Sequence, residues 1–425
     1  FDEMRQYNTI QYKMKFRLTV LSLFCGASSV QSFVPLSLPS RSISSSISSS
    51  FSLSSTTAPT EVDASTGLTP EYQAALDQAM ASVTAVLKEN KPELLGTVVH
   101  FCTEYITAHQ SANLKNPSED SSASSALKRI LESVQLGYKF GMGEDKYTFG
   151  VTHDALRGDE ALSNEMGSDV DFYKWGCDFF RFFIDVDDSV VLGEDNLKQA
   201  MEQAKNGENV VFYANHQSEA DPQVMSIMCE KAGFGKEAED IVYVAGHKVT
   251  TDSLAIPFSM GRNLICIHSK KHIDTDPDTK AEKSRQNMQA MGGMLAKLKK
   301  GGCMLWVAPS GGRDRRDVES GKTPIAPFDS KTVDMFRLMG RKSKVKTNYY
   351  PLSMVSYELC PPPDFVEAGT GEQRNFRFVP VGIKVGEQID PEGGNEAFNP
   401  GAFDRTEKDY YELRERIFPG TAPEL

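Results

Sequence analysis

A histidine and an aspartate stand just beyond a short apolar run, at a spacing that suits acid–base chemistry. Residues 210–213 are apolar or aromatic, which predicts a buried strand; His216 follows it, and Asp221 lies five residues further on. Pro222 disfavours helical dihedral angles at Asp221, and Asp-Pro is a typical N-cap and first-turn pair, so we expect a turn and then a helix. A carboxylate bound to one ring nitrogen would leave the other nitrogen as a general base. The alternative is that Asp221 only caps a helix and His216 lies in a loop.

Two other strand-like runs end in clusters of cations. Residues 264–267 lead into one basic loop, and residues 304–308 lead into a glycine-bearing loop with three arginines; the cations are Lys270, Lys271, His272, Arg313, Arg315 and Arg316. Arginine can bind phosphate oxygens through two parallel hydrogen bonds, and lysine adds a point charge. Either loop alone is typical of a solvated basic turn. The two together, in an acidic protein, indicate a phosphate site.

A base beside a phosphate site predicts a phosphorylated substrate whose hydroxyl group is activated. The sequence contains no metal-ligand cluster and no dinucleotide fingerprint, so we expect neither a metal nor another cofactor. Group transfer to the hydroxyl, most simply acyl transfer, is the chemistry that remains. Ser310 could indicate a nucleophilic serine, but its segment lacks the G-x-S-x-G elbow.

The elements that would position these residues predict two folded regions. Strand-like runs alternate with helical ones after residue 156; the strand-like runs are 210–213, 241–245, 264–267, 304–308, 350–357 and 376–385. Three amphipathic segments precede them and predict a small helical bundle, in which His100 and His109 are ordinary structural histidines. The predicted fold is α/β: a bundle over residues 67–155 and an α/β catalytic domain over residues 156–425. Its sheet should be mixed, mainly parallel and flanked by helices, with the aromatic segment 169–184 packed on it rather than facing lipid.

Composition narrows the classes of function. The chain has 425 residues and a formal net charge of -12; residues 61–425 carry 41 basic and 56 acidic side chains. This balance argues against general nucleic-acid binding and requires any anion site to be a local cluster. No apolar run approaches the roughly 18 residues of a membrane span, so we expect a soluble folded part without a transmembrane segment. Seven scattered cysteines without a C-x-x-C indicate reduced core thiols, with a disulfide set as the alternative.

Residues 1–66 have the composition of a leader that is removed. Met14 is the expected true start, followed by basic residues, an apolar run over 18–25 and small residues, as in a secretory signal. A serine-rich tract without acidic residues extends from Ser32 to about Thr57, as in a transit peptide. The combination resembles the bipartite leaders of proteins imported into secondary plastids, which implies the plastid stroma as the destination. A disordered serine-rich tail is the alternative.

Four blocks in order resemble those of the glycerolipid acyltransferases. Asn215–Pro222 resembles the H-x4-D block, in the full form seen in the soluble plastidial glycerol-3-phosphate acyltransferases. Residues 261–272, 308–315 and 350–363 match the other blocks, and the resemblance covers most of residues 67–425. The lysophosphatidate acyltransferases share H-x4-D but typically have an E-G-T-R block and membrane segments, whereas this chain has Ser310-Gly311-Gly312-Arg313.

The resemblance implies a role for each matching residue. His216 would be the general base for the sn-1 hydroxyl of glycerol 3-phosphate, and Asp221 would orient it. The phosphate would be held by Lys271, His272, Arg313 and Arg315. The donor would be an acyl carrier protein thioester (acyl-ACP), with acyl-CoA as a usable substitute. Three alternatives stay open: a 1-acylglycerol-3-phosphate acyltransferase, a non-catalytic phosphate- or lipid-binding relative, and a hydrolase that uses Ser310.

Overall fold

The computed structural model describes residues 67–90, 92–143, 146–158, 170–269, 273, 277–363, 373–392 and 394–420. The predicted leader, residues 1–66, lies outside these ranges and stays a prediction. The described residues fall within one compact unit.

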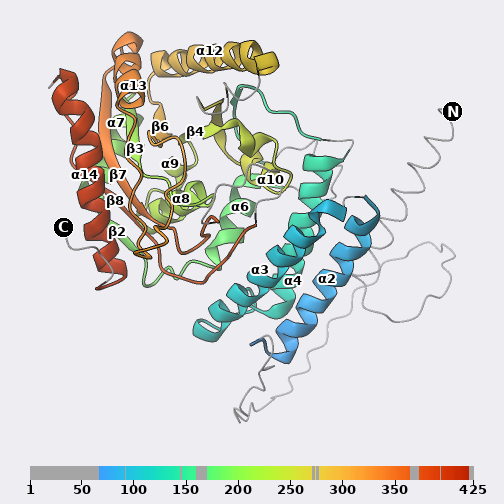
Figure 1. The fold of residues 1–425 in the computed structure, drawn as a ribbon. Helices are drawn as coiled ribbons and strands as arrows, with labels where there is room; N and C mark the ends of the chain where they lie inside the picture. The colour runs from blue at the N-terminus through green and yellow to red at the C-terminus, as the bar shows by residue number, and fades with distance from the viewer. Residues whose placement is uncertain are drawn as a thin grey trace, which may run out of the picture. The chain divides into compact units, whose positions relative to one another are not determined.

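Helices form the first part of the described chain (Figure 1). They are α2 (Pro70–Asn90), η1 (Pro92–Leu94), α3 (Leu95–Lys115), α4 (Ala123–Leu136) and η2 (Gly137–Met142). The apolar stripe of α2 is buried, and α2, α3 and α4 pack on one another, which confirms the predicted bundle. The connection between α3 and α4 is short, because α3 continues to Lys115 and the Ser122 side chain caps α4 by accepting a hydrogen bond from Ser125 N.

A mixed sheet organises the rest of the described chain. Its strands are β1 (Thr152–His153), β2 (Val190–Leu192), β3 (Asn209–Ala214), β4 (Val242–Gly246), β5 (Asn263–Ile267), β6 (Met304–Val307), β7 (Thr347–Val355) and β8 (Gly382–Val385). Their spatial order is β1-β5-β4-β6-β3-β7-β8-β2. Strand β3 is central and pairs in parallel with β6 and β7; β4 pairs in parallel with β5 and β6, and β2 with β8. Only β1–β5 and β7–β8 are antiparallel among the described strand pairs, so the predicted mixed, mainly parallel sheet is confirmed.

Helices cover both faces of this sheet, as the alternating side chains of β3 show. Val210, Phe212 and Ala214 belong to one hydrophobic core, whereas Val211 and Tyr213 belong to another. The helices around the sheet are α6 (Phe172–Arg181), α7 (Glu194–Lys205), α8 (Asp221–Lys231), α9 (Gly235–Ala238), η3 (His247–Thr250), α10 (Ile256–Met260), α12 (Pro277–Lys300), α13 (Ser330–Ser343) and α14 (Gly394–Ile417). Burial on both faces explains why residues 210–213 read as a continuous apolar run rather than an alternating one.

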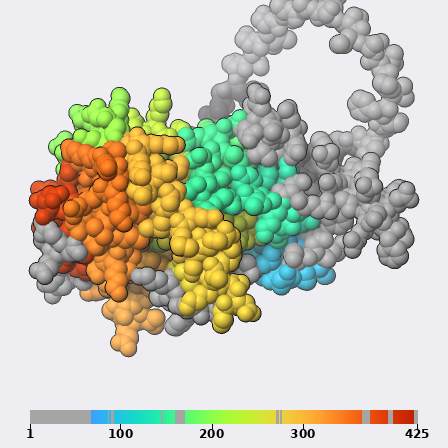
Figure 2. All heavy atoms as spheres, turned by 90° about the horizontal axis from the view of Figure 1, so that it is seen from above, coloured from blue at the N-terminus to red at the C-terminus, as the bar shows by residue number. Residues whose placement is uncertain are grey.

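The second core lies under the three long helices α12, α13 and α14. Leu298 of α12, Phe336 of α13 and Phe398 of α14 meet Tyr213 in this core. Helix α14 packs along β7, and α12 (gold) adjoins α13 (orange) on the surface seen from above (Figures 1 and 2). None of the helices in the described ranges combines the length and apolarity that crossing a bilayer requires.

The aromatic segment around α6 does more than pack on the sheet. Phe179 and Phe183 place their ring centroids 4.8 and 4.7 Å from that of Tyr105 in α3. The bundle and one face of the sheet therefore share a continuous core. His109 lies buried in the same aromatic cluster, donates through Nδ1 to Ser121 O at 3.1 Å, and has its pKa lowered to about 4 by burial. It is a core histidine, as predicted.

Some boundaries differ from the sequence prediction. Strands β1 and β2 have two and three residues, too short for a period-2 pattern to show. Strand β1 joins the sheet although it precedes residue 156, and β8 covers only the end of the predicted run 376–385; the domain boundary itself stays a prediction. The six cysteines of the described part are free, and all except Cys303 are buried; their reduced state stays a prediction.

Candidate active site

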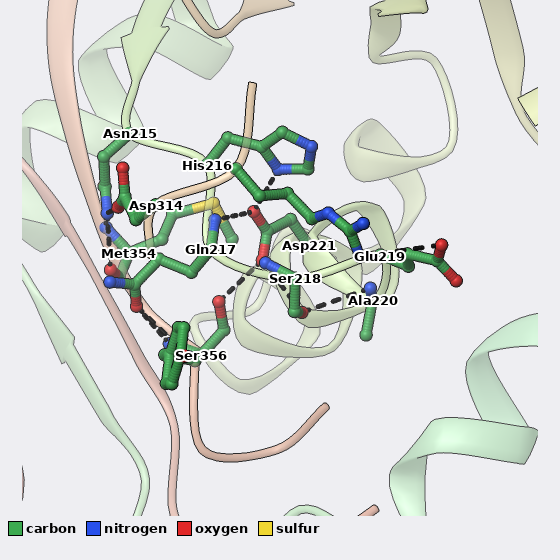
Figure 3. A network of polar contacts seen from close by, with 12 residues as sticks. Asn215, His216, Gln217, Ser218, Glu219, Ala220, Asp221, Asp314, Met354 and Ser356 are labelled. Carbon is green, nitrogen blue, oxygen red and sulfur yellow. Dashed lines mark hydrogen bonds and ion pairs between the residues drawn. The ribbon is translucent and has the colours of Figure 1, made fainter. Parts of the chain in front are cut away.

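His216 and Asp221 form a hydrogen-bonded pair at the carboxyl end of β3 (Figure 3). The distance from His216 Nδ1 to Asp221 Oδ2 is 2.8 Å. The Asp221 side chain is fully buried, whereas 28% of the His216 side chain is exposed. An ionised carboxylate only accepts hydrogen bonds, so Nδ1 carries the proton and Nε2 is left as the basic atom. The predicted base-and-orienter geometry is present.

The Asp221 carboxylate is held in one orientation by four further hydrogen bonds. Oδ2 accepts from Gln217 N at 2.8 Å, and Oδ1 accepts from Ser218 N at 3.1 Å and Ser218 Oγ at 3.2 Å. The fourth donor, Ser356 Oγ, lies 2.6 Å from Oδ1. The predicted turn before a helix is confirmed, with one correction: Asp221 is the first residue of α8, and Ala220 is the N-cap. Its carboxylate points back to the preceding turn because the amides of that turn converge on it.

The histidine loop is fixed to the end of β7 by two amide side chains. Asn215 Nδ2 donates to Met354 O at 3.0 Å, and Asn215 Oδ1 accepts from Met354 N at 2.8 Å. Gln217 Oε1 accepts from Ser356 N at 2.9 Å and from Tyr357 N at 3.2 Å. The edge of the His216 ring meets Trp306 of β6, with centroids 5.6 Å apart. Polar contacts and an aromatic wall thus leave the imidazole little freedom.

Asp314 joins the histidine loop to the arginine loop that follows β6. Its N–H donates to His216 O at 2.5 Å, while Oδ2 accepts from Asn215 Nδ2 at 3.1 Å and Oδ1 from Ala326 N at 2.8 Å. The residue is fully buried, and this burial raises the pKa of Asp314 to about 6, although the hydrogen bonds from Ala326 and Asn215 lower it. Asp314 lies between Arg313 and Arg315 in the chain, so its hydrogen bonds fix the backbone from which both arginine side chains extend.

The predicted phosphate ligands are brought to the site only in part. Arg313 lies 3.6 Å from Glu219 Oε1 in the turn between His216 and Asp221, and its side chain is mostly buried. Arg374 Nε approaches the other oxygen of Glu219 at 2.8 Å. Arg315 is half-buried in the loop that Asp314 ties to His216. Lys271 and His272 lie outside the described residues.

The site combines an accessible base with a guanidinium group on a neighbouring loop. Such an arrangement can take a proton from a hydroxyl group on a molecule that also carries an anion. Ser310 does not take part in the His216 network; its hydroxyl donates to Gly312 O within its own turn. Among the described residues, no three His, Cys, Asp or Glu side chains gather in a way that could hold a metal ion.

Sequence reasoning missed Asn215, Gln217, Asp314 and Ser356 as parts of this site. Asn215 and Gln217 flank His216 in the motif, so their position was a signal that could have been used. Ser356 and Asp314 were hidden because their partners are 135 and 99 residues away in the chain.

Comparison with known proteins agrees with this geometry. Residues 191–355, which include β3, β6 and β7, match the family model described as Acyltransferase. The chain is 34% identical over 317 residues to the chloroplastic glycerol-3-phosphate acyltransferase of Arabidopsis thaliana, covering 72% of this chain and 67% of that protein. It is 35% identical over 326 residues to the chloroplastic glycerol-3-phosphate acyltransferase ATS11 of Cucurbita moschata, covering 73% and 68%. The chain therefore belongs to the family of the chloroplastic glycerol-3-phosphate acyltransferases.

Proposed function

We propose that this chain transfers an acyl group from a carrier thioester to the sn-1 hydroxyl of glycerol 3-phosphate, giving 1-acylglycerol 3-phosphate. The observation that carries the proposal is the pair of His216 and a fully buried Asp221, with a guanidinium-bearing loop bonded to the same turn. The relatives are named for this substrate and reaction.

His216 Nε2 takes the proton of the sn-1 hydroxyl as its oxygen attacks the thioester carbonyl. The imidazolium that forms is stabilised by Asp221, whose carboxylate is already oriented by its other donors. The tetrahedral intermediate then collapses, the C–S bond breaks, and the proton passes from His216 to the departing thiolate. The acyl group passes directly from the thiol to the hydroxyl oxygen, and the hydroxyl proton passes through His216 to the thiol. No acyl-enzyme forms, so neither Ser310 nor a cysteine is needed as a nucleophile.

Arg313, Arg315, Lys271 and His272 hold the phosphate of the acceptor. Arg313 is the best supported of the four, because Glu219 holds its guanidinium beside the turn that carries the base. A dianionic phosphate competes well with one carboxylate for such a group, since charge-assisted bonds to phosphate are strong and can be bidentate. Binding would therefore redirect Arg313 from Glu219 to the substrate.

The donor is acyl-ACP, with acyl-CoA as a substitute, and the site of action is the plastid stroma. The chloroplastic names of the relatives support a plastid. The two-part composition of residues 1–66 supports a secondary plastid, reached through a signal peptide and a transit peptide.

A thiol-release assay with acyl-ACP, with and without glycerol 3-phosphate, tests the proposal. We expect thiol release to depend on glycerol 3-phosphate and to fall at least about a hundredfold in His216→Ala, because that is the low end of what a general base contributes. His247→Ala, outside the catalytic pair, is the matched control. Wild-type-like turnover in His216→Ala would refute the mechanism. Acceptance of 1-acylglycerol 3-phosphate instead of glycerol 3-phosphate, or binding without thiol release, would favour the second-step enzyme or the non-catalytic relative.

A second substitution tests the phosphate site. Arg313→Ala should raise the KM for glycerol 3-phosphate about thirtyfold, which corresponds to about 2 kcal/mol for one charge-assisted contact. The KM for the acyl donor should change little. Arg181→Ala removes an arginine that is also paired with a glutamate, Glu230 at 2.7 Å, but lies on α6, and it serves as the control. An unchanged KM for glycerol 3-phosphate in Arg313→Ala would remove this residue from the site.

A further inference from the structure

A hollow of about 200 Å³ lies beside the catalytic loops, and the chemistry described so far does not use it. We call it the proline hollow, because residues 361–363, three consecutive prolines, form one wall. Arg316 and Arg377 bring two guanidinium groups to it, and Glu358, Tyr357 and Asn375 complete the lining. The prolines fix the wall rigidly, since their φ angles are locked by the ring.

The proline hollow is built on the same two loops as the active site. Tyr357 N donates to Gln217 Oε1 at 3.2 Å, and Gln217 directly follows the base His216. Arg316 is two residues beyond Asp314, whose N–H donates to His216 O. Both loops leave the carboxyl ends of strands β6 and β7, where ligands of parallel sheets bind. The hollow is therefore formed by the loops that also brace the turn carrying His216.

Asn375 connects the proline hollow to the helical bundle. Asn375 Nδ2 donates to Pro361 O at 3.1 Å, and Asn375 Oδ1 lies 2.9 Å from Nε2 of His100 in α3. The hollow is therefore tied to the bundle through Asn375, while its lining comes from the loops after β6 and β7 and from residues 375 and 377. Junctions of this kind are frequent places for ligand pockets.

The charges of the proline hollow favour an anion. Arg316 is exposed, and 53% of the Arg377 side chain is exposed. Glu358 forms an ion pair with Arg377, so the lining carries two cations and one carboxylate in a protein of net charge -12. A local excess of guanidinium in an acidic protein suits phosphate, whose oxygens match the planar donor set of arginine.

We propose that the proline hollow binds the phosphate of the donor's 4′-phosphopantetheine arm. This inference rests on the proposed function, in which the donor is a thioester on that arm, common to acyl-ACP and acyl-CoA. The acceptor's phosphate is assigned to the loop of Arg313 and Arg315, so a second cationic hollow on the loops that brace His216 is available to the second substrate. Binding there would anchor the arm while its thioester end reaches His216.

The test uses two small donors that differ only in the phosphate, acyl-4′-phosphopantetheine and acyl-pantetheine. For the wild type, removal of the phosphate should lower kcat/KM by about tenfold or more, as expected for loss of a charge-assisted contact. In Arg316→Ala and Arg377→Ala this difference should shrink to about threefold or less, while the KM for glycerol 3-phosphate stays unchanged. Acyl-ACP and acyl-CoA should lose activity alongside acyl-4′-phosphopantetheine. Arg181→Ala, which removes a half-buried arginine that is also paired with a glutamate, is the control.

Two results would overturn the inference. One is an equal loss with acyl-pantetheine and acyl-4′-phosphopantetheine, which would mean that the arginines do not sense the phosphate. The other is a rise in the KM for glycerol 3-phosphate, which would assign the hollow to the acceptor. Calorimetric binding of 4′-phosphopantetheine itself gives a readout without turnover: the wild type should bind it and the double variant should not. If the wild type released no thiol at all, the proposed function would fail while this binding measurement still decided the site.

Discussion

Asp314→Asn should change how the stability of the protein depends on pH. Asp314 is fully buried, and its pKa is raised from the ordinary aspartate value of 3.8 to about 6, chiefly by burial. A raised pKa means that the folded state holds a proton that the unfolded state has already released. Between the two pKa values the folded state therefore binds more protons, and stability falls as the pH rises through that window. Asparagine has no such proton, so the variant lacks this fall.

The size of the effect follows from the two pKa values. A difference of about two pKa units corresponds to about 3 kcal/mol between the acidic and alkaline limits. Between about pH 4.5 and about pH 7.5, where most of the titration falls, the wild type should lose about 2 kcal/mol relative to Asp314→Asn. The variant keeps an oxygen for Ala326 N but turns an amide toward the Asn215 amide, which adds a penalty that does not depend on pH.

Denaturant unfolding of both proteins at several pH values measures this difference. Other titrating groups contribute equally to the two proteins and cancel, except those that feel the charge of Asp314. His216 and Asp221 are such neighbours, and Tyr410 and Tyr411 also face this carboxylate. Repeating the comparison in a His216→Ala background removes the coupling to the histidine. If the difference in free energy of unfolding between the wild type and Asp314→Asn stays constant across the pH range, the reasoning is refuted.

Two further predictions concern local packing. Ser356→Ala removes a 2.6 Å hydrogen bond to Asp221 and should lower kcat about tenfold with little change in either KM. The control Ser353→Ala removes a buried hydroxyl that binds only backbone and should leave kcat near wild type. Steady-state kinetics measure both variants, and equal effects on kcat would contradict the role of Ser356. In α12, Gly292→Ala adds a methyl group in open space and should stabilise the protein by up to about 1 kcal/mol. Gly293→Ala places the new methyl group 2.7 Å from the Thr152 methyl group in β1 and should destabilise the protein by about 1–2 kcal/mol. Thermal unfolding of the two variants should shift Tm in opposite directions, and equal shifts would show that the contact yields freely.

The pairing of His216 with Asp221 could be predicted from sequence because both residues belong to one local motif. Residues 210–213 are continuously apolar since β3 is buried on both faces, and this marks where His216 leaves the sheet. Pro222 indicates where α8 begins, which places Asp221 across a turn. These signals need only neighbouring residues. They miss the helix start by one residue, because the amides of the turn decide that position.

The contacts that hold the pair could not be predicted, because they depend on which strands lie side by side. Ser356 reaches Asp221 only because β7 pairs with β3, and Asp314 reaches Asn215 only because β6 pairs with β3 on the other side. No periodicity in the chain encodes that order. The aromatic contacts of α6 with the bundle depend on tertiary arrangement in the same way, whereas β1 could not be predicted because two residues are too few to show a strand pattern.

The order β6-β3-β7 explains why one histidine motif can carry a whole active site. Parallel strands deliver their following loops to the same edge, so the residues after three neighbouring strands must meet there. The central strand leads to His216, one neighbour leads to Asp314 and the arginines, and the other leads to Ser356. The proline hollow continues from the outer two of these loops, through Arg316 and Tyr357. A donor bound there and an acceptor bound by Arg313 would approach His216 from adjacent loops, which is the geometry that direct transfer between two substrates requires.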